Sequence, residues 1–229
     1  PSVIRFLLPV LAAGFVACAP VPLQVAAPAP RTAGVAAANP MAVEAGLEVL
    51  AAGGTAADAA VAVQTMLGLV EPQSSGIGGG AFMLYFDAAT KQITAFDGRE
   101  TAPAAATSGL FLDANKEPLS YRDAVLSCRS TGVPGAMAML GAAHARHGAL
   151  PWQRLLQPAI RAADAGFTVP QRLVRFAGSD FPQAGEPDVR ALFSRADGSP
   201  VQAGDQLKNP AYAATLVQIA GTGPRALLE

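Results

Sequence analysis

The sequence predicts an α+β fold, rich in helices, that holds one antiparallel β-hairpin in its interior. Two runs of strand length, residues 81–86 (AFMLYF) and 92–97 (QITAFD), are rich in aromatic and β-branched residues, and only residues 87–91 separate them. Several other segments repeat apolar residues at helical spacing between capping residues and glycines. One of them, residues 56–70, is apolar nearly all round, which is typical of a helix buried on more than one side.

The first residues have the composition of an export signal. Residues 1–18 carry Arg5, then a short apolar run, then Ala17 directly before Cys18. This resembles a bacterial lipoprotein box, so Cys18 is a candidate lipidation site that would tether the protein in the periplasm or outer cell envelope. The alternative is an ordinary signal peptide with an incidental cysteine. Residues 19–34 are rich in proline and alanine, which predicts an extended linker before a domain at residues 35–229.

Local start and stop signals place two helices at the beginning of this domain. Asn39 followed by Pro40 is a typical helix opening, and Gly53-Gly54 ends that helix. Thr55 with Asp58 three residues later predicts a capping box at the start of the second helix. Pro72 prevents that helix from continuing.

A glycine-rich turn, residues 76–80 (GIGGG), leads into the first strand. Its spacing resembles a dinucleotide-binding fingerprint, but that fingerprint follows a strand and opens a helix, whereas this turn follows a helix. The turn is therefore either a flexible connection or a place where backbone approaches a ligand or another backbone. So many adjacent glycines favour the close approach.

The first strand is apolar on both faces, so we expect helices to cover the hairpin on both sides. The rest of the chain supplies helical patterns separated by loops, and residues 178–207 are expected to be irregular because of their glycine, proline and aspartate turn signals. The predicted helices cover residues 121–127, 134–146, 151–165, 170–177 and 209–220.

The composition excludes some functions and names few partners. Charged residues make up only 14% of the chain and its net charge is -1, so no nucleic-acid-binding face is predicted. His144 and His147 have no acidic residue beside them, and no metal or cofactor site is predicted. Cys128 is either a thiol activated by Arg129 or a buried structural residue, and its apolar context favours burial.

Arg99 is the strongest candidate for binding a ligand. It follows the end of the second strand and Gly98, where a planar guanidinium could hold a carboxylate with two parallel hydrogen bonds. The alternative is a structural ion pair with Asp97 or Glu100. Neighbouring residues on an extended strand point in opposite directions, so a direct pair between Arg99 and Glu100 is not favoured.

Three stretches together resemble the large subunit of the γ-glutamyltransferase (γ-glutamyltranspeptidase) family, from about Gly34 to the end of the chain. They are residues 39–86 (NPMAVEAGLEVLAAGGTAADAAVAVQTMLGLVEPQSSGIGGGAFMLYF), residues 97–107 (DGRETAPAAAT) and residues 130–167 (STGVPGAMAMLGAAHARHGALPWQRLLQPAIRAADAGF). Residues 204–221 resemble the family's next segment.

The resemblance implies a fold and a reaction. The fold is that of the N-terminal-nucleophile hydrolases, a four-layer αββα sandwich of which this chain would form an incomplete N-terminal part. Family members are precursors that cleave themselves and expose a threonine whose own amine acts as base. A γ-glutamyl-enzyme forms and passes the glutamyl group to water or an amine. The substrates are glutathione and other γ-glutamyl compounds.

The resemblance also assigns individual residues. Arg99 corresponds to the family arginine that holds the glutamyl α-carboxylate, and Glu100 is carried over as a local support. We expect the missing C-terminal half of the precursor to bring the catalytic residues, because no threonine here matches the nucleophile: Thr101, Thr107, Thr131, Thr168, Thr215 and Thr222. Two alternatives stay open, a related acylase acting on β-lactam side chains and a non-catalytic envelope lipoprotein remnant.

Overall fold

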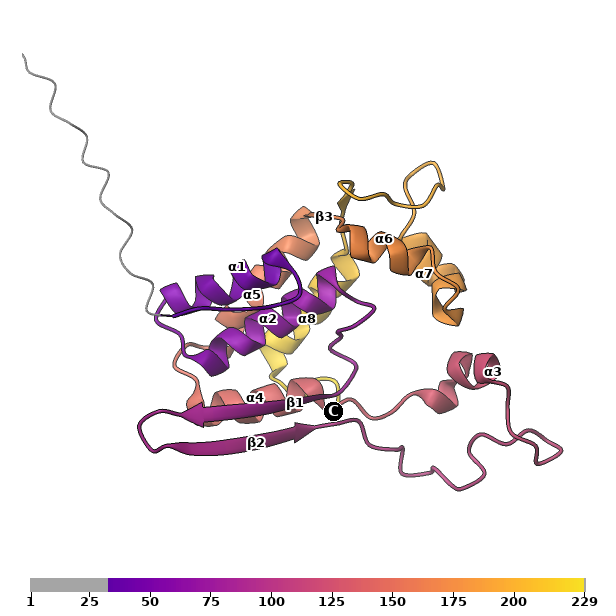
Figure 1. The fold of residues 1–229 in the computed structure, drawn as a ribbon, viewed down its shortest axis with the longest axis horizontal. Helices are drawn as coiled ribbons and strands as arrows, with labels where there is room; N and C mark the ends of the chain where they lie inside the picture. Colours follow the sequence, from indigo (N-terminus) through magenta and orange to yellow (C-terminus); the bar gives the residue numbers. More distant parts are fainter. Residues whose placement is uncertain (1–32, 229) are drawn as a thin grey trace, which may run out of the picture. The chain divides into compact units, whose positions relative to one another are not determined.

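The computed structural model describes residues 33–228, which form a helical body with one β-hairpin against it (Figure 1). The predicted signal segment, Cys18 and most of the linker lie outside the described residues. Within residues 33–228, none of the helices combines the length and the apolar character that crossing a membrane requires.

The first two helices begin where their capping residues predict. Helix α1 (Pro40–Ala51) starts after Asn39, whose side-chain oxygen accepts a hydrogen bond from the first turn. Helix α2 (Ala56–Val70) starts with the complete capping box of Thr55 and Asp58, in which each residue's side chain accepts from the other's backbone N–H. Both predictions are confirmed.

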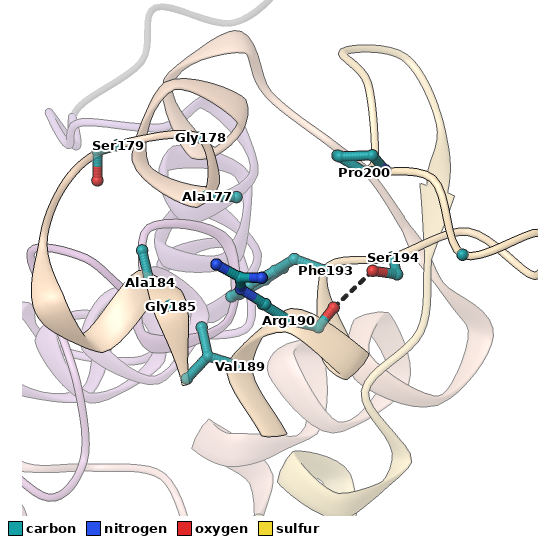
Figure 2. Close-up of a pocket in the computed structure, with 11 residues that line it drawn as sticks. Ala177, Gly178, Ser179, Ala184, Gly185, Val189, Arg190, Phe193, Ser194 and Pro200 are labelled. Carbon is teal, nitrogen blue, oxygen red and sulfur yellow. Dashed lines mark hydrogen bonds between the residues drawn. The ribbon is translucent and has the colours of Figure 1, made fainter. Parts of the chain in front are cut away.

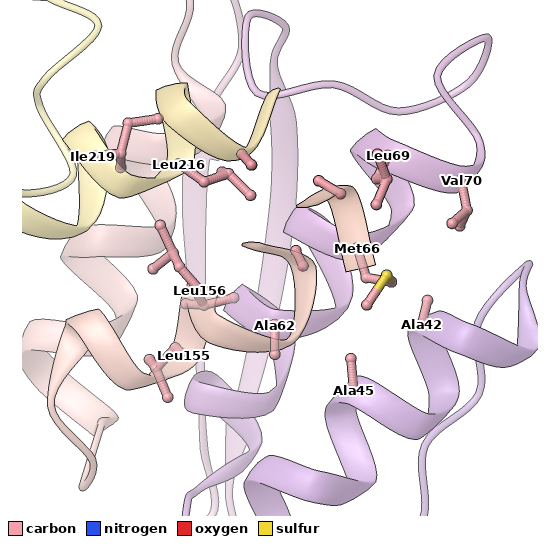
Figure 3. Packing of buried hydrophobic residues seen from close by; sticks show 14 of the residues in the cluster. Ala42, Ala45, Ala62, Met66, Leu69, Val70, Leu155, Leu156, Leu216 and Ile219 are labelled. Carbon is pink, nitrogen blue, oxygen red and sulfur yellow. The ribbon is translucent and has the colours of Figure 1, made fainter. Parts of the chain in front are cut away.

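The core lies where α1 and α2 meet two later helices, α5 (Trp152–Ala165) and α8 (Pro210–Thr222). Small and large side chains alternate there. Ala42, Ala45 and Ala62 let the backbones of α1 and α2 approach closely, and Leu156, Leu216 and Ile219 fill the space between α5 and α8, while Leu155 is buried on another side of α5 (Figure 3). All of these residues are at most 3% exposed. These four helices therefore form the packed body that supports the hairpin and the remaining segments.

Helix α4 (Ala136–His147) lies between this core and the hairpin (Figure 1). It packs against α2 on one side and against both strands on the other. His147 stacks on the ring of Tyr85, with the ring centroids 3.9 Å apart, and Arg146 lies over the ring of Phe96. Helix α4 therefore fixes the hairpin to the helical body.

The region expected to be irregular, residues 178–207, contains short elements, so that prediction is wrong in part. Phe167 and Leu207 pair across forty residues of sequence separation. Pairing over such a distance, by strands of two residues, leaves no periodic signal in the sequence. The remaining elements are α3 (Tyr121–Leu126), η1 (Cys128–Ser130), β3 (Phe167–Thr168), α6 (Gln171–Ala177), η2 (Pro182–Gly185), α7 (Pro187–Leu192) and β4 (Gln206–Leu207).

The predicted hairpin is present, but the expectation that helices cover both of its faces is wrong for the described residues. Strands β1 (Ala81–Asp87) and β2 (Gln92–Gly98) pair antiparallel in continuous register from Ala81 opposite Gly98 to Asp87 opposite Gln92. Met83, Tyr85 and Phe96 face α4, whereas the opposite face is open because residues 33–228 supply a helix on one side only. This open face carries Phe82, Leu84, Phe86 and Ile93, which are 57–75% exposed.

The end of the hairpin meets the start of α4 through two glycines. A Cβ atom built on Gly135 would overlap the carbonyl group of Gly98, and one on Gly98 would lie 2.8 Å from the carbonyl oxygen of Gly135. Neither glycine has a positive φ. Glycine is needed at this point because two backbones lie in direct contact.

We expect Gly135→Ala to destabilise the protein by about 1–3 kcal/mol, because the added methyl group meets rigid backbone and forces the hairpin away from α4. The midpoint of urea unfolding measures this. Gly76→Ala is the matched control, since no atom lies within 4 Å of a Cβ there and φ is not positive. Equal midpoints for the two variants would contradict the close contact.

Candidate functional site

Arg99 lies directly beyond the end of β2, where its backbone is anchored and its side chain is largely exposed. Its backbone N–H donates to Asp97 Oδ1 at 2.9 Å, which turns the chain as it leaves the strand. The Arg99 side chain is 67% exposed. The structure therefore presents Arg99 outward from a well-anchored backbone, as a ligand-binding arginine requires.

Arg99 and Glu100 form an ion pair, contrary to the prediction that a direct pair is unfavourable. Arg99 Nη1 lies 2.9 Å from Glu100 Oε2, although no hydrogen bond is aligned on that oxygen. The contact is thus one of charge rather than of directed hydrogen bonding. The prediction failed because β2 ends at Gly98, so the alternation of side chains along a strand does not extend to residues 99 and 100.

Glu100 is lodged between two glycines. A Cβ on Gly80 would overlap the Glu100 carboxylate, and a Cβ on Gly132 would lie 2.8 Å from Glu100 Cβ. The pKa of Glu100 is lowered, mainly by a hydrogen bond from its own backbone N–H; desolvation opposes this, and the charge of Arg99 and the N–H of Gly80 lower the pKa further. The carboxylate is therefore ionised at neutral pH and holds one side of the Arg99 guanidinium.

The glycine-rich turn connects this site to α4, so the expected close approach is confirmed and is an approach to backbone. The carbonyl oxygen of Gly79 accepts from the N–H groups of Gly135 and Ala136, at 3.2 and 3.1 Å. These are donors at the start of α4 that lack partners within the helix. The turn thus caps α4 and holds Glu100 at the same time.

A pocket of about 310 Å³ opens beside Arg99. Thr101 pairs with Val133 through two backbone hydrogen bonds, which brings the segment after β2 against the segment before α4. Arg129 also lines the pocket and donates from Nη1 to the carbonyl oxygens of Leu110 and Leu112, at 3.2 and 2.9 Å. The lining residues are Arg99, Glu100, Thr101, Ala102, Pro103, Leu110, Phe111, Arg129, Ser130, Thr131 and Gly132.

The two histidines and Cys128, which the sequence also singled out, do not line this pocket. His144 Nε2 donates to the carbonyl oxygen of Leu150 at 2.8 Å, and His147 packs on Tyr85. Cys128 is exposed, so the expectation of a buried thiol is wrong. No three histidine, cysteine, aspartate or glutamate side chains within residues 33–228 are grouped so that they could hold a metal ion.

A second pocket, of about 360 Å³, lies among α6, η2 and α7, with the Arg190 side chain reaching across it (Figure 2). Ser194 Oγ, at its edge, donates to the carbonyl oxygen of Arg190 at 2.7 Å. No residue that the sequence marked for chemistry lines this pocket. The pocket beside Arg99 is therefore the better candidate, although it is the smaller of the two.

The sequence model of the family described as gamma-glutamyltranspeptidase matches residues 42–229 of this chain. The chain belongs to the γ-glutamyltranspeptidase family. The match includes the glycine-rich turn, the hairpin, Arg99 and the pocket beside it, so the site described above lies inside the part of the chain that the family model matches.

Relatives in the family are similar along most of this chain. It is 38% identical over 195 residues to the glutathione hydrolase proenzyme of Bacillus subtilis (strain 168), and 40% identical over 184 residues to glutathione hydrolase 3 of Arabidopsis thaliana. These alignments cover 85% and 80% of this chain, but only 33% and 28% of the relatives. The chain therefore spans about a third of the length of the curated relatives it matches.

The fold agrees with solved structures of the family. The Helicobacter pylori γ-glutamyltranspeptidase superposes with a TM-score of 0.78 at 30% identity, covering 86% of this chain and 56% of that one. The Bacillus anthracis transpeptidase CapD gives a TM-score of 0.70 at 34% identity, covering 86% and 61%. The chain thus has the α+β fold of this family, as predicted.

The sequence identified part of the site and missed part. Arg99 and Glu100 lie together at one pocket, as the motif predicts, while their roles toward a substrate stay predictions. Arg129 was considered only as a neighbour of Cys128. Its place at the same pocket as Arg99 depends on how the loop at residues 101–120 folds back, and a single sequence carries no signal for that path.

Proposed function

We propose that this chain forms the substrate-carboxylate side of an enzyme that cleaves γ-glutamyl amide bonds and transfers the glutamyl group to water or to an amine. The observation that carries the proposal is the geometry of Arg99. Arg99 Nη1 lies 2.9 Å from Glu100 Oε2, and the mostly exposed Arg99 side chain lines the pocket. A free guanidinium edge suits the α-carboxylate of a γ-glutamyl group. Glu100 supports it by neutralising and orienting the opposite side.

The reaction further requires a nucleophile, for which we propose a threonine in the remaining part of the precursor. Autoproteolysis would expose this threonine, and its own amine would take up the hydroxyl proton as the γ-glutamyl-enzyme forms. Similar proteins of Bacillus subtilis and Escherichia coli are named glutathione hydrolase proenzymes. The open apolar face of the hairpin supports a partner of this kind, because a surface with Phe82, Leu84, Phe86 and Ile93 exposed together favours burial against another part of the protein.

For the location we propose the periplasm or outer cell envelope, with lipidation of Cys18 as a tether. The support is the sequence pattern of residues 1–18 alone. Metabolic labelling with a palmitate analogue tests it: labelling of the exported protein that is lost in Cys18→Ser supports the tether, and equal labelling of both contradicts it.

A related acylase is the competing function. A cephalosporin acylase from Bacillus halodurans superposes with a TM-score of 0.66 at 27% identity, covering 82% of this chain and 35% of that one. The superposition on the H. pylori γ-glutamyltranspeptidase is better, with a TM-score of 0.78. An exposed arginine at the pocket also favours substrates with a carboxylate at that position.

The proposed function is tested by assaying the complete, self-cleaved protein with a γ-glutamyl anilide and with a cephalosporin. We expect release of the aniline from the γ-glutamyl compound and little or no deacylation of the cephalosporin. A properly cleaved protein that leaves the anilide intact would refute the proposal, and the opposite preference would establish the acylase.

A further inference from the structure

The pocket beside Arg99 is lined by a second arginine, and this feature bears on which γ-glutamyl compounds the site accepts. Arg129 lies in η1, and Arg99 follows β2, so the two come from separate elements that the Thr101–Val133 bridge brings together. Both side chains line the same pocket of about 310 Å³.

The hydrogen bonds of Arg129 leave most of its donors free. In the part of the chain that the structure describes, both hydrogen bonds of its guanidinium come from Nη1, to the carbonyl oxygens of Leu110 and Leu112. A guanidinium has five N–H donors in a planar fork, so Nε and Nη2 keep donors for another acceptor. The two carbonyl groups fix the side chain without neutralising its charge.

The charges at this pocket are unbalanced. Its lining has the two guanidinium groups and one carboxylate, Glu100, which is already engaged by Arg99. Among residues 33–228, no carboxylate lies within ion-pair distance of Arg129. The pocket thus offers positive charge at two separate points, and a ligand with two carboxylates would match it.

We infer that Arg129 binds a second carboxylate, on the leaving group of the substrate, so that the site prefers γ-glutamyl peptides with a free terminal carboxylate over γ-glutamyl compounds with a neutral leaving group. This inference rests on the proposed function, in which Arg99 holds the glutamyl α-carboxylate. Leu110 and Phe111 line the same pocket, and Leu110 supplies one of the carbonyl groups that hold Arg129, so the leaving group would meet apolar side chains there.

The test uses two donors that differ in one charge, γ-glutamyl-glycine and γ-glutamyl-glycinamide, with the complete self-cleaved protein and its Arg129→Gln variant. We expect kcat/KM of the wild type to be higher for the glycine donor by up to about fivefold, the upper end of the range for one exposed ion pair. In Arg129→Gln the ratio should fall to about one, because the added preference depends on this charge. Arg129→Lys keeps the charge without the fork and should retain part of the ratio.

The ratio of kcat/KM between the two donors separates a binding role of Arg129 from a merely structural one. If Arg129 only held the loop at Leu110 and Leu112, its loss would lower the turnover of both donors equally and leave the ratio unchanged, which would overturn the inference. A wild-type ratio of one would overturn it whether or not either variant folds. Turnover of neither donor by the cleaved wild type would instead refute the proposed function, and the inference with it.

Discussion

Replacement of Arg99 by glutamine is expected to raise KM for a γ-glutamyl donor by about 100-fold, with a much smaller change in kcat. A bidentate, charge-assisted contact with the α-carboxylate is lost, and glutamine can replace at most one neutral hydrogen bond of it. The contact is far from the bond that breaks, so it acts on substrate and transition state alike and appears mainly in KM. Steady-state kinetics of the complete self-cleaved protein measure the effect.

Two further variants make this measurement specific to Arg99. Arg99→Lys keeps the charge but loses the planar fork, so its KM should lie between those of the wild type and the glutamine variant. Arg154→Gln removes an exposed arginine on α5, outside the lining of the pocket, and should leave KM unchanged. An unchanged KM in Arg99→Gln would remove Arg99 from substrate binding.

The parts of the fold that the sequence predicts are those determined by local interactions. The capping oxygen of Asn39 and the capping box of Thr55 and Asp58 act within three residues, so both helix starts could be placed from the sequence. The hairpin is equally local, because a short turn connects two runs that pair with each other. In contrast, the pairing of Phe167 with Leu207 depends on tertiary structure, and it was missed.

The same distinction applies to the site. Arg99 stood out because its chemistry, its glycine neighbour and its place after a strand are all visible in the sequence. Its pairing with Glu100 was not predicted, because the pairing depends on where β2 ends and on Gly80 and Gly132 enclosing the carboxylate. Arg129 reaches the pocket only through the fold of a long irregular loop. Residue types are thus readable from the sequence, while their convergence requires the structure.

Asp58 illustrates how a residue predicted for a local role also holds distant parts together. Its carboxylate is fully buried and accepts three backbone N–H groups on Oδ2, from Thr55 in its own capping box and from Ala149 and Leu150 after α4. The distances are 3.0, 2.9 and 3.2 Å. Its other oxygen, Oδ1, has no hydrogen bond and lies 3.6 Å from His144 Nε2. The start of α2, the end of α4 and the turn between α4 and α5 therefore depend on one side chain.

Asp58→Ala is accordingly expected to destabilise the protein by about 3–5 kcal/mol, because it removes a fully buried carboxylate and leaves its three partly buried N–H donors without their acceptor. Asp58→Asn keeps an oxygen at the same place but loses the charge that favours a helix N-terminus, so it should cost only about 1–2 kcal/mol. Urea unfolding of the complete protein measures both changes.

The control for this prediction is Thr55→Ala, which removes the other half of the capping box and leaves the hydrogen bonds to Ala149 and Leu150 in place. Loss of the cap alone should cost about 1 kcal/mol. If Asp58→Ala proves no more costly than Thr55→Ala, the carboxylate acts only as a helix cap. A cost several times larger means that it also joins α2 to the turn that follows α4. Helix α4 packs against the hairpin, and through Gly79 it also contacts the glycine-rich turn that encloses Glu100. Asp58→Ala should therefore also raise KM for a γ-glutamyl donor, measured on the protein that remains folded.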